Sequence, residues 1–562
     1  MPTGEYLDTP PNFALSFELN NQVFAGSSTD ELPGSFSFPA QVPLTGNNKA
    51  LLGHPHRPDN AAAWQSWPEV WVYAEGVAMF VGELKIRSCT QTKASVNITV
   101  NALTTLKDIM LPQIDMEGER TIGAWETFAI YQKIVARNSD DYDFVFFQVE
   151  AYDPVGPGFY YNRFDPLTGE FDESVSILTP FVRLSYLLKR AFLQYAPGYT
   201  FDNAWQGFDP ELLNLYIFNN ADARVLTSYT PYTVTEPETL NLQKHLPKIK
   251  FVDFLKNIIA QWGLGVFINP WDKRIRLAAL QEVLSRQPKY DWTQYALAER
   301  TIEAASGAPG FYNYTQPSDV LPEMPPIENM TVFLSDKDWD DRTTPLAQGY
   351  YYLEFISVVV EVNASGFERF VGLYHRGERP GDGPDYQVGM ECLLDSYGFG
   401  MRTVGGEASR WYIVDDAGTT KYEWRDNAAP IALVLYRGWQ DHGTGFERMP
   451  VAQNHVWDLH HNSPDRVEIS ENGTTITTAK RSLNWFGDYG LYNTAHHAWS
   501  EMLRNGKHVT QSFVLPLGVL KAFSFEDKIR SGNMEYFVKK LRVQKLLGKG
   551  KVLVEASMVS VI

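Results

Sequence analysis

The chain has 562 residues, of which 44% are hydrophobic and 21% are charged. This length predicts several folded domains, and the near-average use of Gly and Pro excludes collagen-like, low-complexity and disordered chains. Acidic residues outnumber basic ones and give a net charge of −18. Because that field repels phosphates, sequence-specific nucleic-acid binding is not expected.

The charge is distributed unevenly along the chain. Residues 501–562 contain eleven Lys or Arg and five Asp or Glu, a net charge of +6, so the first 500 residues carry −24. Two interpretations of the basic end stay open: a solvated hairpin face, or a docking surface for an acidic partner or subunit.

The sequence also bears on where the protein is found. Its longest apolar runs are far shorter than the roughly 18 to 20 residues of a spanning helix, so we expect no membrane span. The acidic, Pro-containing first eleven residues do not resemble a Sec-type signal. Cys89 and Cys392 cannot form a disulfide framework, which favours a reducing compartment or assembly inside a cell.

Residues 1–105 are predicted to form a β domain, a small barrel or sandwich. Apolar residues alternate with small or polar ones at Phe13, Leu15, Phe17 and Leu19. Further strands are expected at 35–42, 70–86 and 94–104. The tryptophans of this domain are interpreted as core or rim aromatics rather than ligand-binding side chains: Trp64, Trp67 and Trp71.

Residues 106–300 are predicted to form an α+β region with two helix-plus-strand units. Thr179 and Pro180 indicate the start of a helix that ends at Pro197 and leads to a strand at 213–218. Upstream of this unit, the expected elements are a short helix at 126–134 and a strand at 143–152.

The second unit, residues 248–280, has the clearest pattern in the chain. Four apolar residues spaced three, four and three positions apart form one helical stripe, and the next residue is placed for a left-handed helix cap. These five predicted structural residues are Val252, Leu255, Ile259, Trp262 and Gly263. A hairpin of strands at 264–268 and 274–278 follows, and we expect the stripe to hold the helix on it.

Frequent Pro and Gly between about 300 and 325 indicate a boundary. Residues 301–480 are predicted to be a β-sandwich-like insertion, with strands at 350–362, 367–374, 410–414, 431–436 and 466–469. Residues 481–562 are predicted to contain a helix at 494–504 and strands at 509–514, 517–523, 536–544 and 551–561. Gly548, Lys549 and Gly550 would turn the last two strands into a hairpin. The fold class is therefore mainly β with short helices, a β-rich α+β protein.

Patterns for catalysis or metal binding are weak. The chain has no GxSxG, Walker A or GxGxxG motif, and its histidines do not follow zincin spacing. The acidic run at 336–341 lacks the Gly and Glu that an EF-hand needs. We therefore predict no enzyme activity and no catalytic, cofactor-binding or metal residue. A carboxylate pair for glycoside hydrolysis stays open, because its separation is a three-dimensional quantity.

Four segments resemble phage tail hub proteins, in particular the large tail or baseplate proteins of phages and prophages of Bacteroidetes. They are residues 35–57, 180–201, 248–280 and 535–561. The first segment contains an LLG-P-R turn formed by Leu51, Leu52, Gly53, Pro55 and Arg57. Residues 326–480 lie outside the resemblance. A more distant similarity extends to the hubs of contractile tails and of the type VI secretion spike.

The resemblance implies a structural virion protein, a tail or baseplate hub built from small β-barrels and assembled in the host cytoplasm. Such a hub links the tail tube to the tip or spike as a homotrimer or another ring, and its channel conducts genomic DNA. An acidic channel wall would let DNA slide without sticking. The alternative is a carbohydrate-binding or depolymerising tail protein that engages host surface glycans. A third possibility is a secretion-machine spike component.

Overall fold

The fold is seen in a computed structural model. It describes residues 5–10, 16–20, 35–37, 40–59, 66–74, 76–100, 106, 108–121, 144–146, 149–151, 159–162, 176–177, 179–219, 225–229, 232–235, 239–269, 272–303, 313–315, 329–335, 337–338, 344–353, 358–362, 368–373, 385–387, 400–401, 407–414, 420–426, 433–441, 448–452, 469–471, 474–476, 481 and 491–561.

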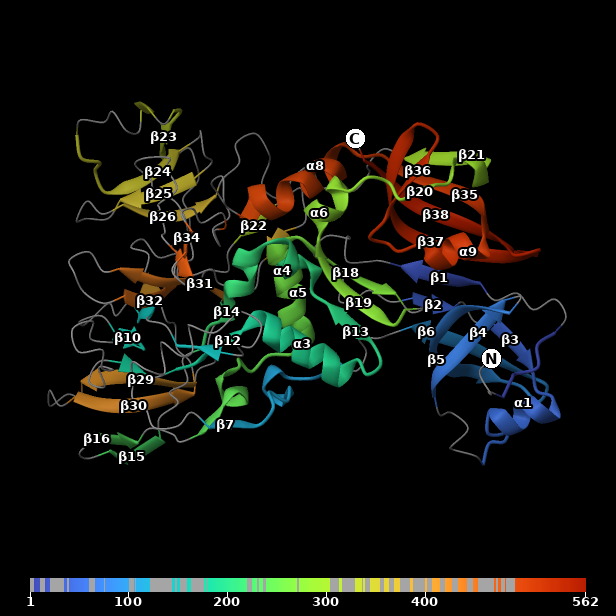
Figure 1. The fold of residues 1–562 in the computed structure, drawn as a ribbon, viewed down its shortest axis with the longest axis horizontal. Helices are drawn as coiled ribbons and strands as arrows, with labels where there is room; N and C mark the ends of the chain where they lie inside the picture. Colours follow the sequence, from blue (N-terminus) through green and yellow to red (C-terminus); the bar gives the residue numbers. More distant parts are fainter. Residues whose placement is uncertain are drawn as a thin grey trace.

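Strands are the main regular structure in these residues, which confirms the predicted β-rich α+β class. The largest sheet has 12 strands, and its main path runs β21-β35-β38-β37-β1-β2-β6-β5-β4. Figure 1 shows its blue and red halves side by side. The strands are β1 (Phe17–Asn20), β2 (Ser35–Ser37), β3 (Ala40–Pro43), β4 (Trp67–Ala74), β5 (Val77–Cys89), β6 (Lys93–Val100), β20 (Tyr290–Asp291), β21 (Ala296–Glu303), β35 (His508–Pro516), β36 (Lys528–Ser531), β37 (Met534–Gly548) and β38 (Lys551–Val561).

The long strand β37 joins the two halves of this sheet. Its first residues pair with β36, and its middle pairs with β1, where Leu541 lies opposite Leu19 and Val543 opposite Phe17. All four side chains are buried in one apolar cluster. Strands β1–β6 and β35–β38 therefore share a sheet and a core, although the two groups are far apart in the sequence.

The central region confirms the predicted helix, cap and hairpin. Helix α5 (Phe251–Trp262) ends at Gly263, whose φ of 55° is left-handed. The antiparallel strands β18 (Leu264–Asn269) and β19 (Arg274–Ala279) follow directly. A third strand, β13 (Thr200–Asp202), pairs in parallel with β19. The amphipathic helix thus packs beside a three-stranded sheet of the same unit.

The helix predicted from Thr179 begins later than expected. Residues Phe181–Arg183 form strand β12, and helix α3 starts at Leu184 and ends at Tyr195. Strand β12 pairs with β14 (Leu215–Ile217) and β8 (Phe144–Val145). Sheet pairing with distant residues satisfies the backbone groups here and overrides the local capping signal. The predicted start of the helix was therefore wrong.

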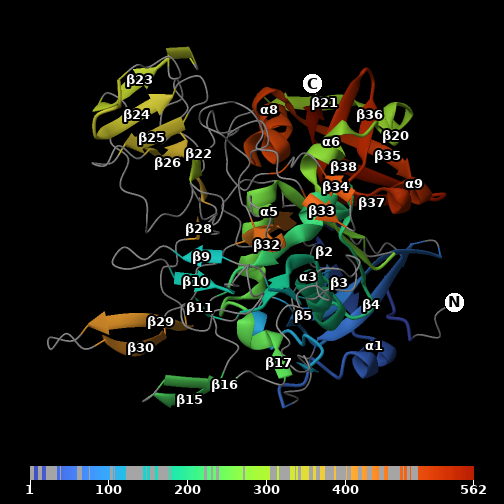
Figure 2. The same cartoon turned by 60° about the vertical axis from the view of Figure 1, so that its left-hand side comes forward.

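Residues 301–480 are connected to the central region through strand pairing. Strand β31 (Leu433–Asp441) pairs with β14, and Leu433 and Leu435 belong to the central core. The predicted single strand at 350–362 is a hairpin of β24 (Gly349–Leu353) and β25 (Val358–Val362). Strand β31 therefore contributes to the central core, and Figure 2 shows β24 and β25 to one side of the body. Residues 301–480 as a β-sandwich-like insertion stay a prediction.

The last segment confirms most of its predicted elements and corrects one strand. Strands β37 and β38 form the predicted hairpin, with positive φ at Gly548, Lys549 and Gly550. The predicted strand at 517–523 is instead helix α9 (Leu517–Ala522), because Leu517 and Leu520, one turn apart, are both buried. The predicted helix at 494–504 is a π-helical turn, Tyr492–His496, followed by α8 (His497–Asn505).

Some predictions concern residues outside the described ones: Phe13, Leu15, Trp64, Cys392 and the helix at 126–134. Among the helices that the structure does describe, none has the length and apolar character needed to cross a bilayer.

Candidate functional site

The five predicted structural residues lie at the end of α5 and along its packed face. Val252, Leu255 and Trp262 are buried, and Ile259 is partly buried against the same cluster. That cluster also contains the hairpin residues Leu264, Val266, Ile275 and Leu277. The helix stripe and its hairpin therefore share one core.

The end of α5 is closed by the π-helical turn. The indole rings of Trp262 and Trp205 are 5.4 Å apart at their centroids. Beside them, a Cβ built on Gly263 would lie 2.6 Å from the main-chain oxygen of Ala495. Gly263 therefore serves two purposes: it adopts the left-handed cap, and it allows another backbone to approach closely.

His496 continues this contact inside the protein. Its Nε2 lies 2.9 Å from the main-chain oxygen of Gln261, so Nε2 carries the proton that is donated. Burial lowers the pKa of His496 to about 4, although the bond to the Gln261 carbonyl acts in the opposite direction. The imidazole is therefore neutral at neutral pH.

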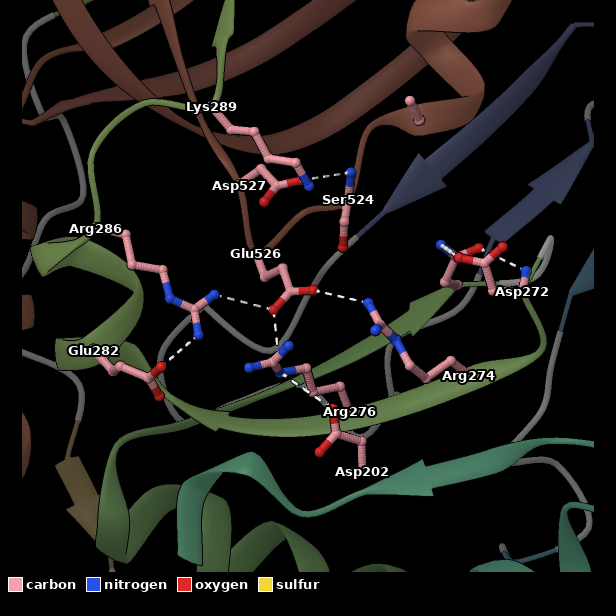
Figure 3. A network of polar contacts seen from close by, with 12 residues as sticks. Asp202, Asp272, Arg274, Arg276, Glu282, Arg286, Lys289, Ser524, Glu526 and Asp527 are labelled. Carbon is pink, nitrogen blue, oxygen red and sulfur yellow. Dashed lines mark hydrogen bonds and ion pairs between the residues drawn. The ribbon is translucent and has the colours of Figure 1, made fainter. Parts of the chain in front are cut away.

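A cluster of ions surrounds Glu526, in the connection between α9 and β36 (Figure 3). Three guanidinium groups contact its carboxylate, each at 3.2 Å: those of Arg274, Arg276 and Arg286. The first two arginines come from β19, and Arg286 follows helix α6 (Leu280–Ser285). One carboxylate thus ties the central hairpin and α6 to the segment leading into the twelve-stranded sheet.

Two further carboxylates offset the positive charge of the three arginines around Glu526. Glu282 pairs with Arg286 one helical turn away, and Asp202 on β13 lies 3.6 Å from Arg276. The Glu526 side chain is only 6% exposed, whereas its three partners are partly exposed. Burial alone would lower the pKa of Arg286, but the contacts with Glu282 and Glu526 raise it. The charged form of Arg286 is therefore stabilised.

An apolar cluster continues the same junction. It brings α6, α8, β37 and β38 together through Phe267, Ala278, Leu280, Val283, Leu284, Trp499, Met502, Phe537 and Val559. Buried Lys528 donates to the main-chain oxygen of Leu284 at 2.8 Å and pairs with Glu535 at 3.1 Å. Apolar packing and paired ions thus fix the central region against the large sheet.

One exposed aromatic lies at the edge of this junction. Trp71 on β4 is 36% exposed and stacks with Tyr73. Its Nε1 donates to Glu69, which also pairs with Lys273 at 3.2 Å. The Lys273 ammonium lies 5.9 Å from the centre of the Trp71 ring. The interpretation of Trp71 as a rim aromatic agrees with this position.

Within the described residues, no group of three or more His, Cys, Asp or Glu side chains could hold a metal ion. Cys89 is a free, partly buried thiol, and burial raises its pKa.

The Glu526 cluster was not found from the sequence. Its members come from residues 202, 274–286 and 526, and only Glu282 and Arg286, at i and i+4, form a local pattern. Comparison with family models and with curated proteins found no match for this chain.

Proposed function

We propose that the chain is a structural subunit of a phage tail or baseplate hub. In this role it joins the tail tube to the tip or spike and assembles with further copies into a homotrimer or another ring. It would be located in the virion tail after assembly in the host cytoplasm. The work of such a protein is to hold surfaces in fixed positions, which demands rigid junctions between its parts.

One observation carries the proposal. The four segments that resemble hub proteins, far apart in sequence, build one connected body. Residues 35–57 and 535–561 contribute strands to the twelve-stranded sheet, while 180–201 and 248–280 form much of the central core. The Glu526 cluster and the adjoining apolar cluster join these two parts. If the chain shares the architecture of hub proteins, the four segments that resemble them should pack together, as these segments do.

The charge of the chain suits a DNA-conducting ring. The first 500 residues carry −24, which disfavours adhesion of passing DNA because few cations are offered to its phosphates. In the proposed ring, acidic side chains face the channel. A neutral or basic channel wall in the assembled particle would contradict this part of the proposal.

Antibody labelling tests the proposed location. Gold-labelled antibodies against the purified protein should bind isolated particles at the end of the tail tube, and antibodies against the capsid serve as the control. Label on fibres or on capsids, with none at the tube end, would contradict a hub.

A second candidate function is glycan binding by a tail protein, and Trp71 is the observation that favours it. An exposed indole beside a carboxylate and an ammonium offers the apolar platform and the polar groups that sugar recognition uses. Incubation with host capsule or cell-wall glycans separates the two functions. Release of reducing ends, or binding that Trp71→Ala abolishes, would support this candidate over a hub-only role.

A further inference from the structure

A basic turn follows helix α1 (Gly46–Leu51), which lies in the blue part of the structure, away from the red half of the large sheet (Figure 1). Residues 32–58 contain no Asp or Glu, although the first 500 residues carry −24. The basic side chains at the turn are Lys49, His54, His56 and Arg57. These four residues, the α1 turn, form a cationic patch on an acidic protein.

Hydrogen bonds and burial hold the backbone of the α1 turn in one conformation. The main-chain nitrogen of His54 donates to the Lys49 oxygen at 2.7 Å, and that of Arg57 donates to the His54 oxygen at 3.1 Å. Leu52 belongs to the apolar cluster of the large sheet, and Pro55 is buried. His54 has a φ of 56°, a left-handed conformation that strains a non-glycine backbone. The basic side chains are therefore carried by a well-defined support.

The charges of the α1 turn are not offset by its own chain. Within the described residues, none of the four side chains forms an ion pair. The imidazole rings of His54 and His56 are 6.0 Å apart at their centroids. Burial and the three neighbouring basic groups lower the pKa of His56, and its Nδ1 is buried without a hydrogen-bond partner. A bound anion would relieve this repulsion between like charges.

The carboxylates in the vicinity do not fill that role. Asp8 accepts a hydrogen bond from Thr45, at the opposite end of α1. Asp59 is exposed and is not among the groups that shift the pKa of His56. The anion must therefore come from another molecule.

The chemistry of the α1 turn suits an anion better than a metal ion. Zinc sites in proteins use three or four protein ligands, and the described residues contain no group of three or more His, Cys, Asp or Glu that could hold a metal. The charges of Lys49 and Arg57 also repel a cation. A guanidinium group, in contrast, matches the oxygens of a phosphate with two parallel N–H bonds, and a protonated imidazole is a further donor.

We propose that the α1 turn is a binding site for a dianionic phosphate group, either free phosphate or a phosphate monoester. Arg57 and Lys49 supply permanent positive charge, and His54 and His56 become donors to the anion when they are protonated. Binding therefore takes up protons, and the affinity rises as the pH falls. The phosphodiesters of DNA carry a single charge each and are repelled by the acidic body. The site goes beyond the proposed hub function and does not depend on it.

Isothermal titration calorimetry of the full chain with inorganic phosphate tests the site. Wild type should bind about one phosphate per chain at pH 6, and at least about tenfold more weakly at pH 8. Titrations in two buffers of different ionisation enthalpy should show proton uptake. Sulfate does not titrate in this range, so the same pH dependence with sulfate assigns the effect to the protein. Glucose 6-phosphate is the second probe: tighter binding than free phosphate assigns the site to monoesters, and weaker binding assigns it to the free ion.

Variants separate the two kinds of charge. H54N/H56Q should weaken binding at pH 6 to its level at pH 8, and K49Q/R57Q should weaken it at both pH values. R87Q/K93Q removes one arginine and one lysine that are exposed elsewhere in the same sheet, and it should bind as wild type does. Thermal unfolding of each variant shows whether it is folded.

Two results would overturn the inference. One is the absence of phosphate binding at pH 6, or binding that persists in both folded variants of the α1 turn. The other is a short DNA duplex that binds these residues more tightly than phosphate does. The antibody-labelling test of the hub is independent of both, because it locates the chain in the particle without reference to the α1 turn.

Discussion

His496 donates a hydrogen bond from Nε2 to the main-chain oxygen of Gln261, 2.9 Å away, and so joins the π-helical turn to the last turn of α5. Both residues are buried. Because the donor is a titratable group without access to water, the contact makes the stability of the fold depend on pH.

The pKa of His496 predicts acid destabilisation. The pKa of His496 is about 4 in the folded protein and 6.5 in the unfolded chain. Between these two pH values the imidazole is therefore protonated in the unfolded chain and neutral in the folded protein. The contribution of His496 to the free energy of unfolding is therefore fully present above pH 6.5. It is lost as the pH falls from 6.5 to about 4, and it changes no further below that. The total loss is about 3 kcal/mol. Urea unfolding at several pH values measures it.

His496→Gln should remove this pH dependence, since the amide donates without titrating. The exposed neighbour His497 provides the control, because His497→Gln should keep the wild-type pH profile. An H496Q variant with an unchanged profile between pH 4 and 6.5 would contradict the assignment.

Trp262→Ala should lower the free energy of unfolding by about 3 to 5 kcal/mol, because it leaves a cavity beside Trp205. Chemical unfolding followed by circular dichroism gives the difference. The surface substitution Leu193→Ala, at a side chain 61% exposed, should change stability by less than about 0.5 kcal/mol. Equal effects of the two variants would show that Trp262 is not a core residue.

Gly263→Ala should destabilise the protein by more than the backbone strain of an alanine at positive φ. The added Cβ would meet the Ala495 oxygen at 2.6 Å in addition to the backbone strain. Gly532 also has a positive φ, of 64°, but no atom within 4 Å of an added Cβ. Gly532→Ala therefore reports the strain alone, about 1 to 2 kcal/mol. Melting temperatures of the two variants that coincide would argue against the close approach.

Glu526→Gln should destabilise the junction by up to about 3 kcal/mol, because three guanidinium groups lose their shared carboxylate. Asp108→Asn breaks an exposed pair with Lys250 and should cost less than about 1 kcal/mol. Limited proteolysis near the junction, compared between the two variants, adds a local measurement. Identical digestion and stability in both would mean that the Glu526 cluster does not hold the parts together.

Local patterns allowed the sequence to predict some elements correctly. The spacing from Val252 to Trp262, followed by Gly263, predicted α5, its cap and the hairpin, because these features depend on neighbouring residues. The glycines at 548 and 550 predicted the last turn for the same reason.

The errors came where distant residues decide the structure. Phe181–Arg183 became a strand because β8 and β14 pair with it, and nothing near Thr179 records those partners. The Glu526 cluster likewise combines residues more than 200 positions apart, such as Arg286 and Glu526. Sequence patterns reveal the periodicity of a single helix or strand. The Glu526 cluster instead depends on tertiary contacts between segments that are distant in the sequence.

A density map of the tail end of the particle tests the proposed function most directly. The account predicts a ring of this chain at the end of the tail tube, with acidic side chains on the channel wall. A map in which the tube end is built from other proteins, with this chain elsewhere on the particle or missing from it, would contradict the account.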